Sequence, residues 1–195
     1  MSDSTLMHRY VRTWEVMASR GCETSWIDLG PTALRARGRA VGLTPEPYWV
    51  TYALQTGEDF VTRRLEVTVQ TGTGTTSLDL RRDEAGQWTA DGTPRPDLDD
   101  ALDCDLGLCP LTNTMPVLRH GLHRRAEAAP REFLMAWVSV PDLSVRPLRQ
   151  RYTHLASAEH GARIRYESGS FRSDLEVDEH GLVLDYPQLA SALTR

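Results

Sequence analysis

The stretch ALRARGRAV, residues 33–41, alternates between two kinds of side chain. Small or apolar residues stand at 34, 36, 38 and 40, and arginines stand at 35, 37 and 39. Successive side chains of a β-strand point to opposite faces of the sheet. This period of two therefore predicts a strand with one buried face and one exposed face.

The same alternation recurs along the chain, in residues 48–54, 60–69, 77–80, 162–168 and 171–178. Turn signals separate these runs, at residues 71–75, 83–86, 90–96, 168–170 and 178–181. We therefore expect about ten strands and a mainly β fold. Helical signal is scarce. We expect one short helix after Thr112–Thr114, capped by those side chains with Pro116 in its first turn, and another turn or two at residues 186–193.

One run, FLMAWVSV at residues 133–140, is apolar on both faces. A strand of this kind in an antiparallel sheet is buried on both sides. Either other parts of the protein cover its second face, or the sheet curls around an apolar cavity. The sequence leaves both interpretations open.

The chain has 195 residues and a formal net charge of -5, which favours one domain, residues 1–195, with residues 1–13 as a flexible N-terminal segment. A protein that binds nucleic acid would normally carry a basic surface, so no nucleic-acid partner is expected. Three cysteines without framework spacing, a polar N-terminus and no apolar run of roughly 20 residues predict a cytoplasmic protein with no membrane span.

The 22 basic residues are all arginine. GC-rich coding would produce this bias. A functional explanation is that the planar guanidinium suits phosphate, carboxylate and sugar hydroxyls better than an ammonium does. Composition does not separate the two explanations. The role of the five tryptophans is also left open, because an indole can stack on a sugar, line a lipid pocket or fill a core.

The stretch DCDLGLCPLTNTMPVLRH, residues 103–120, concentrates polar residues and cysteines. Cys104 and Cys109, with His120 and His123 downstream, match zinc spacing only loosely, so no metal is expected. The acidic run at residues 97–105 lacks the glycine and glutamate of a calcium loop. Asp105 differs from the other acids, because it stands where a carboxylate can accept hydrogen bonds from the Thr-Asn-Thr cluster.

Two segments of the chain show a weak internal similarity: LDLRRDEAGQW at residues 78–88 and LEVDEHGLV at residues 175–183. In each, a strand ends at Asp-Glu, turns at a glycine and gives way to another strand. An ancient duplication would explain this similarity. So would chance, because such turns are common in hairpins.

Several separated stretches together resemble one known family. They are DCDLGLCPLTNTMPVLR (103–119), VPDLSVRPLRQRYT (140–153) and LEVDEHGLVLDYPQL (175–189), with looser matches in GCETSWIDL (21–29), GRAVG (38–42) and YALQTGEDFVTRRLEV (52–67). The family is the bacterial one named "Putative glycolipid-binding", formerly a domain of unknown function. Phe60 stands where the family often has tryptophan.

The resemblance implies a curved antiparallel sheet that forms a spiral β-roll or incomplete barrel, with one or two short helices. The family's motif residues fall on Asp105, Pro110, Thr112, Asn113, Thr114, Pro116, Arg119, Gln150, Tyr152, Asp178, Gly181, Asp185, Tyr186 and Pro187. It also implies a glycolipid or other amphipathic small molecule as partner, held in a concave apolar cavity of a monomer or homodimer.

We therefore expect a binding protein without catalytic residues, metal or cofactor. The expected ligand-binding residues are Thr112, Asn113, Arg119, Gln150, Tyr152, Trp137, Tyr52 and Asp105. The alternative is a hydrolase-like enzyme for a small polar substrate, in which Asp105, Asn113, Arg119, His154 and Tyr152 converge. A structural or partner-binding module is a third hypothesis, which a large exposed apolar patch would support.

Overall fold

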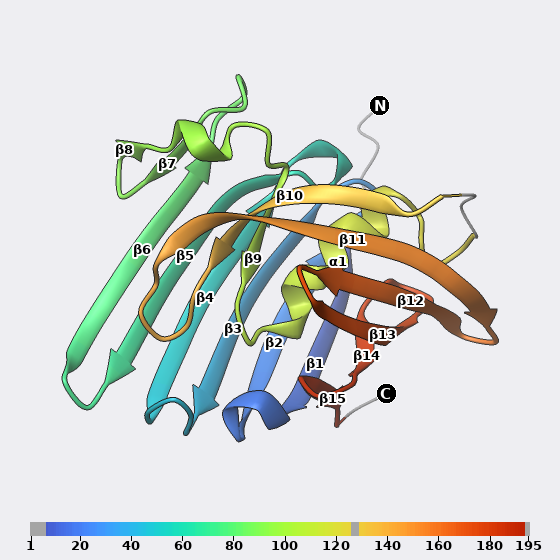
Figure 1. Cartoon of the computed structure of the whole chain (residues 1–195), viewed down its shortest axis with the longest axis horizontal. Coiled ribbons are helices and arrows are strands. Elements are labelled where there is room, and N and C mark those ends of the chain that lie inside the picture. The colour runs from blue at the N-terminus through green and yellow to red at the C-terminus, as the bar shows by residue number, and fades with distance from the viewer. Residues whose placement is uncertain (1–6, 126–128, 194–195) are drawn as a thin grey trace.

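The computed structural model describes residues 7–125 and 129–193, in which one 15-stranded sheet carries almost all the regular structure (Figure 1). The N-terminal strands are β1 (His8–Val16), β2 (Gly21–Leu29), β3 (Leu34–Gly42), β4 (Tyr48–Thr56), β5 (Thr62–Thr71), β6 (Gly74–Arg82), β7 (Trp88–Ala90) and β8 (Thr93–Pro94). The C-terminal strands are β9 (Asp103–Leu106), β10 (Arg131–Val138), β11 (Val145–Ala158), β12 (Gly161–Ser168), β13 (Phe171–Asp178), β14 (Val183–Tyr186) and β15 (Ala190–Ala192).

The helical segments are short: α1 (Thr114–Arg119) and the 3-10 turns η1 (Met17–Ser19), η2 (Glu58–Phe60), η3 (Pro96–Leu98) and η4 (Pro110–Asn113). The strand order is β8-β7-β6-β5-β4-β3-β2-β1-β15-β14-β13-β12-β11-β10-β9, so two meanders join where β1 pairs with β15. Every pairing is antiparallel except β9 with β10. The predicted mainly β fold is confirmed, with more strands than the ten expected.

The sheet rolls over on itself, so that its β9 edge returns to β5, the fourth strand from the opposite edge. Just before β9, the Leu102 carbonyl accepts a hydrogen bond from the Thr62 amide on β5 at 3.0 Å, and the Cys104 amide donates to Thr62 Oγ1 at 3.0 Å. In Figure 1, β10 and β11 arch across β1–β5, with α1 between the two layers. The predicted curved sheet that does not close into a barrel is confirmed.

The chain itself fills the inside of the roll. Two clusters of buried apolar side chains meet there, and residues 98–122 contribute to both: Leu111 and Met115 to the cluster against β1–β6, and Val117 and Leu122 to the cluster against β10–β14. Residues 110–117 are all buried. These residues, which we call the crossover, therefore pack as core on the concave side of the sheet.

Strand β10 separates these two clusters, which explains its unusual sequence. Met135 belongs to one cluster, while Ala136 and Val138 belong to the other. Because adjacent side chains of a strand point to opposite faces, protein packs on both sides of this part of β10. This arrangement matches the interpretation in which other parts of the protein cover its second face.

Three local predictions are wrong. Residues 8–13, expected to be flexible, pair with β2 as part of β1, while residues 1–6 lie outside the described residues. No side chain caps α1, because the Thr112 hydroxyl donates to Asp105 and the side-chain amide of Asn113, the N-cap residue, donates to Tyr152. Residues 190–192 form β15 rather than a helix, since pairing with β1 and β14 satisfies backbone groups that a short helix would leave open.

The two Asp-Glu-x-Gly turns have the same geometry. Asp83 Oδ1 accepts the Gln87 amide at 2.8 Å, and Asp178 Oδ1 accepts the Leu182 amide at 2.9 Å. The turn glycines have φ of 90° and 75°, a conformation that favours glycine. A shared origin of the two hairpins stays a hypothesis.

Candidate functional site

Five of the expected site residues meet in one hydrogen-bonded network inside the roll. Asp105 comes from β9, Thr112 and Asn113 from η4, and Gln150 and Tyr152 from β11. Thr112 Oγ1 donates to Asp105 Oδ1 at 2.7 Å, and Gln150 Nε2 donates to Oδ2. Asn113 Nδ2 donates to the Tyr152 hydroxyl at 2.9 Å, and that hydroxyl donates to Gln150 Oε1 at 3.2 Å.

This network joins the crossover to β9 and β11. All five residues are buried, and burial raises the pKa of Asp105. Both oxygens of Asp105 already have donors within the protein. Because buried polar groups need partners, this arrangement holds the crossover in one position inside the core. A ligand contact by these residues stays a prediction.

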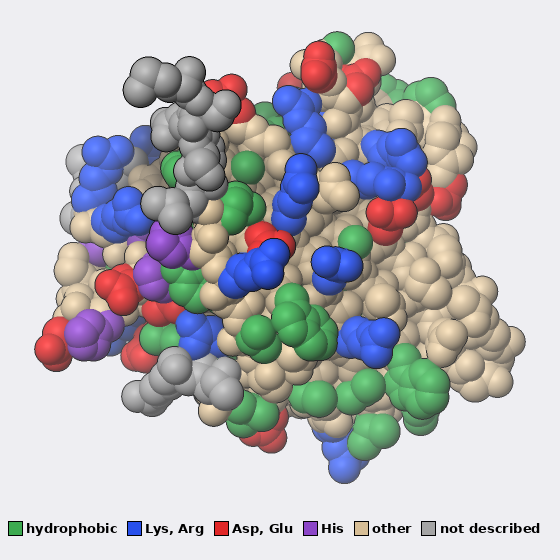
Figure 2. Space-filling model, turned by 180° about the vertical axis from the view of Figure 1, so that it is seen from behind, with side chains coloured by type: hydrophobic (Ala, Val, Ile, Leu, Met, Phe, Trp, Pro, Cys, Tyr) green, Lys and Arg blue, Asp and Glu red, His purple; other side chains and the backbone are tan. Residues whose placement is uncertain are grey.

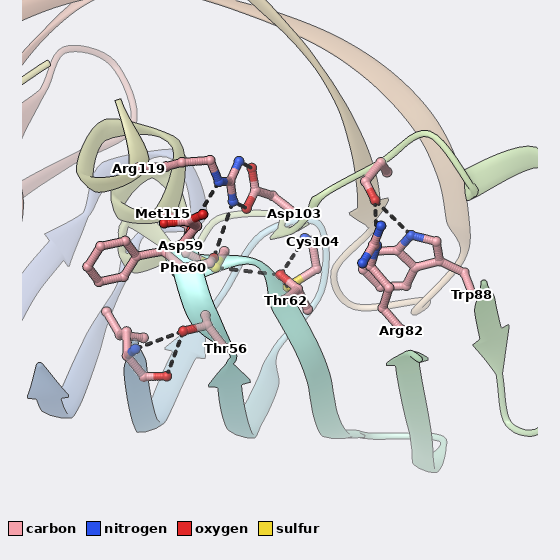
Figure 3. A network of polar contacts seen from close by, with 12 residues as sticks. Thr56, Asp59, Phe60, Thr62, Arg82, Trp88, Asp103, Cys104, Met115 and Arg119 are labelled. Atoms are coloured by element: carbon pink, nitrogen blue, oxygen red, sulfur yellow. Dashed lines mark hydrogen bonds and ion pairs between the residues drawn. The ribbon is translucent and has the colours of Figure 1, made fainter. Parts of the chain in front are cut away.

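Arg119, a sixth expected site residue, lies in a separate contact set (Figure 3). Its Nη1 donates to Asp103 Oδ2 at 2.8 Å, and its Nη2 donates to Oδ1 of the same carboxylate. Its Nε donates to the Asp59 carbonyl at 2.8 Å, and Nη2 also reaches the Phe60 carbonyl at 3.2 Å. Arg119 therefore ties the end of α1 to β9 and to η2.

Tyr52, the seventh, bonds to the carboxylate of Glu23, which was not among the expected site residues. The Tyr52 hydroxyl and Ser25 Oγ both donate to Glu23 Oε1, the latter at 3.0 Å. Glu23 is fully buried, and desolvation raises its pKa to about 7. The signal was present in the sequence, because Glu23 alternates with exposed residues on the same face as Ile27 and Leu29.

Trp137, the eighth, lies under a cation. The Arg146 guanidinium stands 4.5 Å from the centroid of its ring, a cation–π distance. The eight expected residues therefore occupy four separate places. The hydrolase hypothesis needs Arg119 and His154 beside Asp105, but Arg119 bonds to Asp103, and His154 Nδ1 lies 2.8 Å from the Leu122 carbonyl.

Two of the three cysteine thiols are packing groups. Cys104 and Cys109 are buried, and burial raises the pKa of Cys104 to about 12. Thiols with such pKa values are not nucleophiles at neutral pH. Across residues 7–125 and 129–193, no three histidine, cysteine, aspartate or glutamate side chains meet as potential metal ligands. In the same ranges, no helix has the length and apolar character needed to cross a bilayer.

A groove of about 830 Å³ crosses the outer face of β1–β5, the face that the core leaves exposed. Figure 2 shows this side of the molecule, with blue arginine side chains running across it among green hydrophobic ones. The lining includes Val11, Trp26, Arg37, Arg39, Thr51, Ala53, Glu66 and Thr68. The alternation in residues 33–41 predicted that the arginines of β3 are exposed, but they were not among the expected site residues.

Two of the three arginines that line this groove, Arg37 and Arg39, are available to a ligand, whereas Arg9 is paired with Asp28 at 3.0 Å. The side chains of Arg37 and Arg39, and that of Arg35 on the same face of β3, have no ion pair or hydrogen bond to any residue in the described part of the chain. A second arginine-rich groove, of about 570 Å³ beside β6 and β7, differs in this respect. Its Arg64 binds Asp79, and its Arg82 donates to the Ala101 carbonyl.

An aromatic ring lies beside the arginine row. Trp26 is 55% exposed and pairs in register with Arg37 on one side and with Val11 on the other. Arg37 is paired with Ala53 on β4, and Arg39 with Thr51, so only short side chains separate the guanidiniums from β5. The groove thus combines an exposed indole face, unpaired cations and threonine hydroxyls, which is chemistry suited to an anionic sugar.

Comparison with known families shows which family the chain belongs to. Residues 11–192 match the family described as "Putative glycolipid-binding", and the chain belongs to that family. A crystal structure of a DUF1089 family protein from Pseudomonas aeruginosa is 33% identical, with a TM-score of 0.72, over 87% of this chain and 91% of that one. The resemblance inferred from the motifs is confirmed.

A second solved structure, a β-barrel-like protein of the DUF1849 domain of unknown function from Brucella abortus, covers 97% of both chains. It is 7% identical, with a TM-score of 0.47. No curated protein matches the chain.

Proposed function

We propose that this protein binds the head group of a glycolipid in the outer groove of β1–β5. The observation that carries the proposal is that an exposed indole, Trp26, lies directly beside Arg37 on the neighbouring strand, and that the Arg37 guanidinium has no ion pair within the described residues. Membership of the family supports a lipid-binding role. We place the ligand on the outer face because the crossover packs on the concave side of the sheet.

The groove favours a sugar that carries negative charge. A sugar ring presents C–H groups that pack on an indole face, while its hydroxyls can bond to Thr51 and Thr68. A sulfate or phosphate would bind between Arg37 and Arg39, whose Cα atoms are about 7 Å apart for a two-residue step along a strand. Guanidinium groups bind such anions through two parallel N–H donors.

The test compares vesicles that differ only in the head group of a minor lipid. Phosphatidylcholine vesicles would contain phosphatidylglycerol, galactosylceramide or its sulfate ester, sulfatide, with equal charge in the two anionic preparations. We expect tighter binding to sulfatide than to phosphatidylglycerol, because only sulfatide offers a sugar as well as an anion. Equal binding to these two lipids would contradict the proposal.

Variants locate the site. Trp26→Ala and Arg37→Ala should each reduce the preference for sulfatide about tenfold. This reduction corresponds to the loss of a contact worth roughly 1.4 kcal/mol. Arg172→Ala is the matched control, because Arg172 is an exposed arginine on β13, outside the groove. A preference that survives both groove variants would place the site elsewhere.

A further inference from the structure

Three hairpin turns lie together at one end of the sheet, the lower end in Figure 1. They connect β1 to β2, β3 to β4, and β5 to β6. The first two are bonded directly, because the Ser19 carbonyl accepts the Leu43 amide at 2.8 Å and the Thr44 amide at 3.2 Å. Trp49 on β4 is paired in register with Gln70 on β5, which leads into the third turn.

Large apolar side chains at this end are exposed to solvent. The exposed fractions are 44% for Met17, 43% for Val41, 56% for Leu43 and 64% for Trp49. We call these four residues the apolar tip. A groove of about 550 Å³ runs between Val41, Leu43 and Trp49, and Arg20 forms part of its wall. Hydrophobic side chains gather along this lower edge in Figure 2.

The outer surface of β1–β4, which leads to the tip, carries a charge opposite to that of the whole protein. Arg20 and Arg39 lie near the tip together with Glu15 and Glu46, whereas Arg9 and Arg35 lie toward the other end of the strands. The side chains of β1–β4 and their turns that are not buried include five arginines and three acids: Arg9, Arg20, Arg35, Arg37, Arg39, Glu15, Asp28 and Glu46. This surface therefore carries a surplus of two positive charges, although the chain as a whole has a net charge of -5. An apolar end beneath a positive face is complementary to an anionic lipid surface.

We propose that the apolar tip docks on the surface of an anionic bilayer. Trp49 would lie at the level of the head groups, where an indole can bury its ring and keep its N–H hydrated. Leu43 and Val41 would enter the acyl boundary, and Arg20 and Arg39 would contact lipid phosphates. The docking needs no sugar and so does not depend on the proposed head-group site.

The two features share one face of the sheet. Arg39 lines the head-group groove and lies two residues before Val41 of the tip. A protein docked through the tip would therefore hold its groove close to the lipid head groups. Docking would restrict the search for a glycolipid to the membrane surface and raise its local concentration.

The experiment measures co-sedimentation with vesicles that contain no glycolipid. Wild-type protein is mixed with phosphatidylcholine vesicles with and without phosphatidylglycerol, at low and high salt. We expect binding to the anionic vesicles and weaker binding at high salt. The double variant Leu43→Ser/Trp49→Ser should bind at least about tenfold more weakly, because it removes most of the apolar area that would enter the bilayer.

Arg20→Ala should weaken binding about fivefold and reduce its dependence on salt. Leu102→Ser is the matched control, because Leu102 is also an exposed leucine, at 38%, but lies at the opposite end of β5, beside Thr62. Thermal unfolding of each variant checks that it is folded.

Equal vesicle binding by the wild type and a folded Leu43→Ser/Trp49→Ser variant would overturn the proposal. So would the absence of binding to anionic vesicles. A third outcome is concentration-dependent dimerisation of the wild type, lost in the double variant, without vesicle binding. That outcome would make the tip an interface between two copies of the chain and would also overturn the proposal.

Discussion

The ring of Tyr52 occupies the space that a side chain at Gly38 would need. A Cβ built on Gly38 would lie 2.2 Å from Cζ of that ring, far inside van der Waals contact. The two residues are paired in register on β3 and β4. The absence of a side chain at position 38 lets the ring cross the neighbouring strand, so that its hydroxyl reaches Glu23.

Replacement of Gly38 by alanine should displace this ring. We expect Gly38→Ala to lower the free energy of unfolding by about 2–3 kcal/mol, as overpacking of a core does. Urea unfolding measures the change. Gly72→Ala is the control, because a Cβ there would meet no atom within 4 Å. A Gly38→Ala variant as stable as Gly72→Ala would show that Tyr52 can move aside without cost.

The stability of the protein should fall as the pH rises through the titration of Glu23. Burial raises the folded-state pKa of Glu23 from 4.5 to about 7, so the folded state holds this proton more tightly than the unfolded state. The free energy of unfolding therefore declines from the unfolded-state pKa up to about pH 7 and levels off above it. The shift corresponds to a decline of about 3 kcal/mol.

Glu23→Gln should remove this part of the pH dependence and make the protein more stable than the wild type at pH 8. Urea unfolding at pH 5 and pH 8 measures the difference between the two proteins. The glutamine oxygen can still accept the bonds from Ser25 and Tyr52. Glu15→Gln is the control, because Glu15 is exposed on the same part of the sheet. Parallel pH profiles for wild type and Glu23→Gln would mean that Glu23 stays charged in the folded protein.

The crossover network should contribute to stability. Asn113→Ala removes the donor to the buried Tyr152 hydroxyl, which we expect to cost about 1–3 kcal/mol of unfolding free energy. A double-mutant cycle with Tyr152→Phe measures the coupling between the two side chains. If Asn113→Ala instead keeps full stability and loses sulfatide binding, the crossover contacts the ligand, as the motifs predicted.

Replacement of Arg119 should lower the free energy of unfolding more than replacement of Asn113 does. Arg119→Met leaves Asp103 buried without its cationic partner, and we expect a loss of about 3–5 kcal/mol in chemical unfolding. The double variant Asp103→Asn/Arg119→Met should recover part of this loss, because the uncompensated charge is gone. No recovery would indicate that the bonds from Arg119 to the Asp59 and Phe60 carbonyls contribute most of the stability.

Local signals predicted the strands well and the ends of the chain poorly. The alternation in residues 34–42 predicted which side chains of β3 are buried, because period two depends only on strand geometry. Residues 190–192 carry a weak helical signal, yet they form a strand because β1 and β14 stand on either side of them. The secondary structure of such a segment depends on strands that are distant in the sequence. The local propensity of its residues carries no information about those strands.

The sequence by itself determined that this is a β-rich chain of one family, with arginines on one face of β3 and apolar residues on the other, because alternation and ordered motifs are local properties. Only the tertiary structure decided what lies inside the roll and what stays outside. Rolling of the sheet brings β9 to β5 and packs Thr112 and Asn113 as core, since their polar atoms find partners there. The same roll leaves Trp26 and the arginine row on the outer surface, free to meet a ligand.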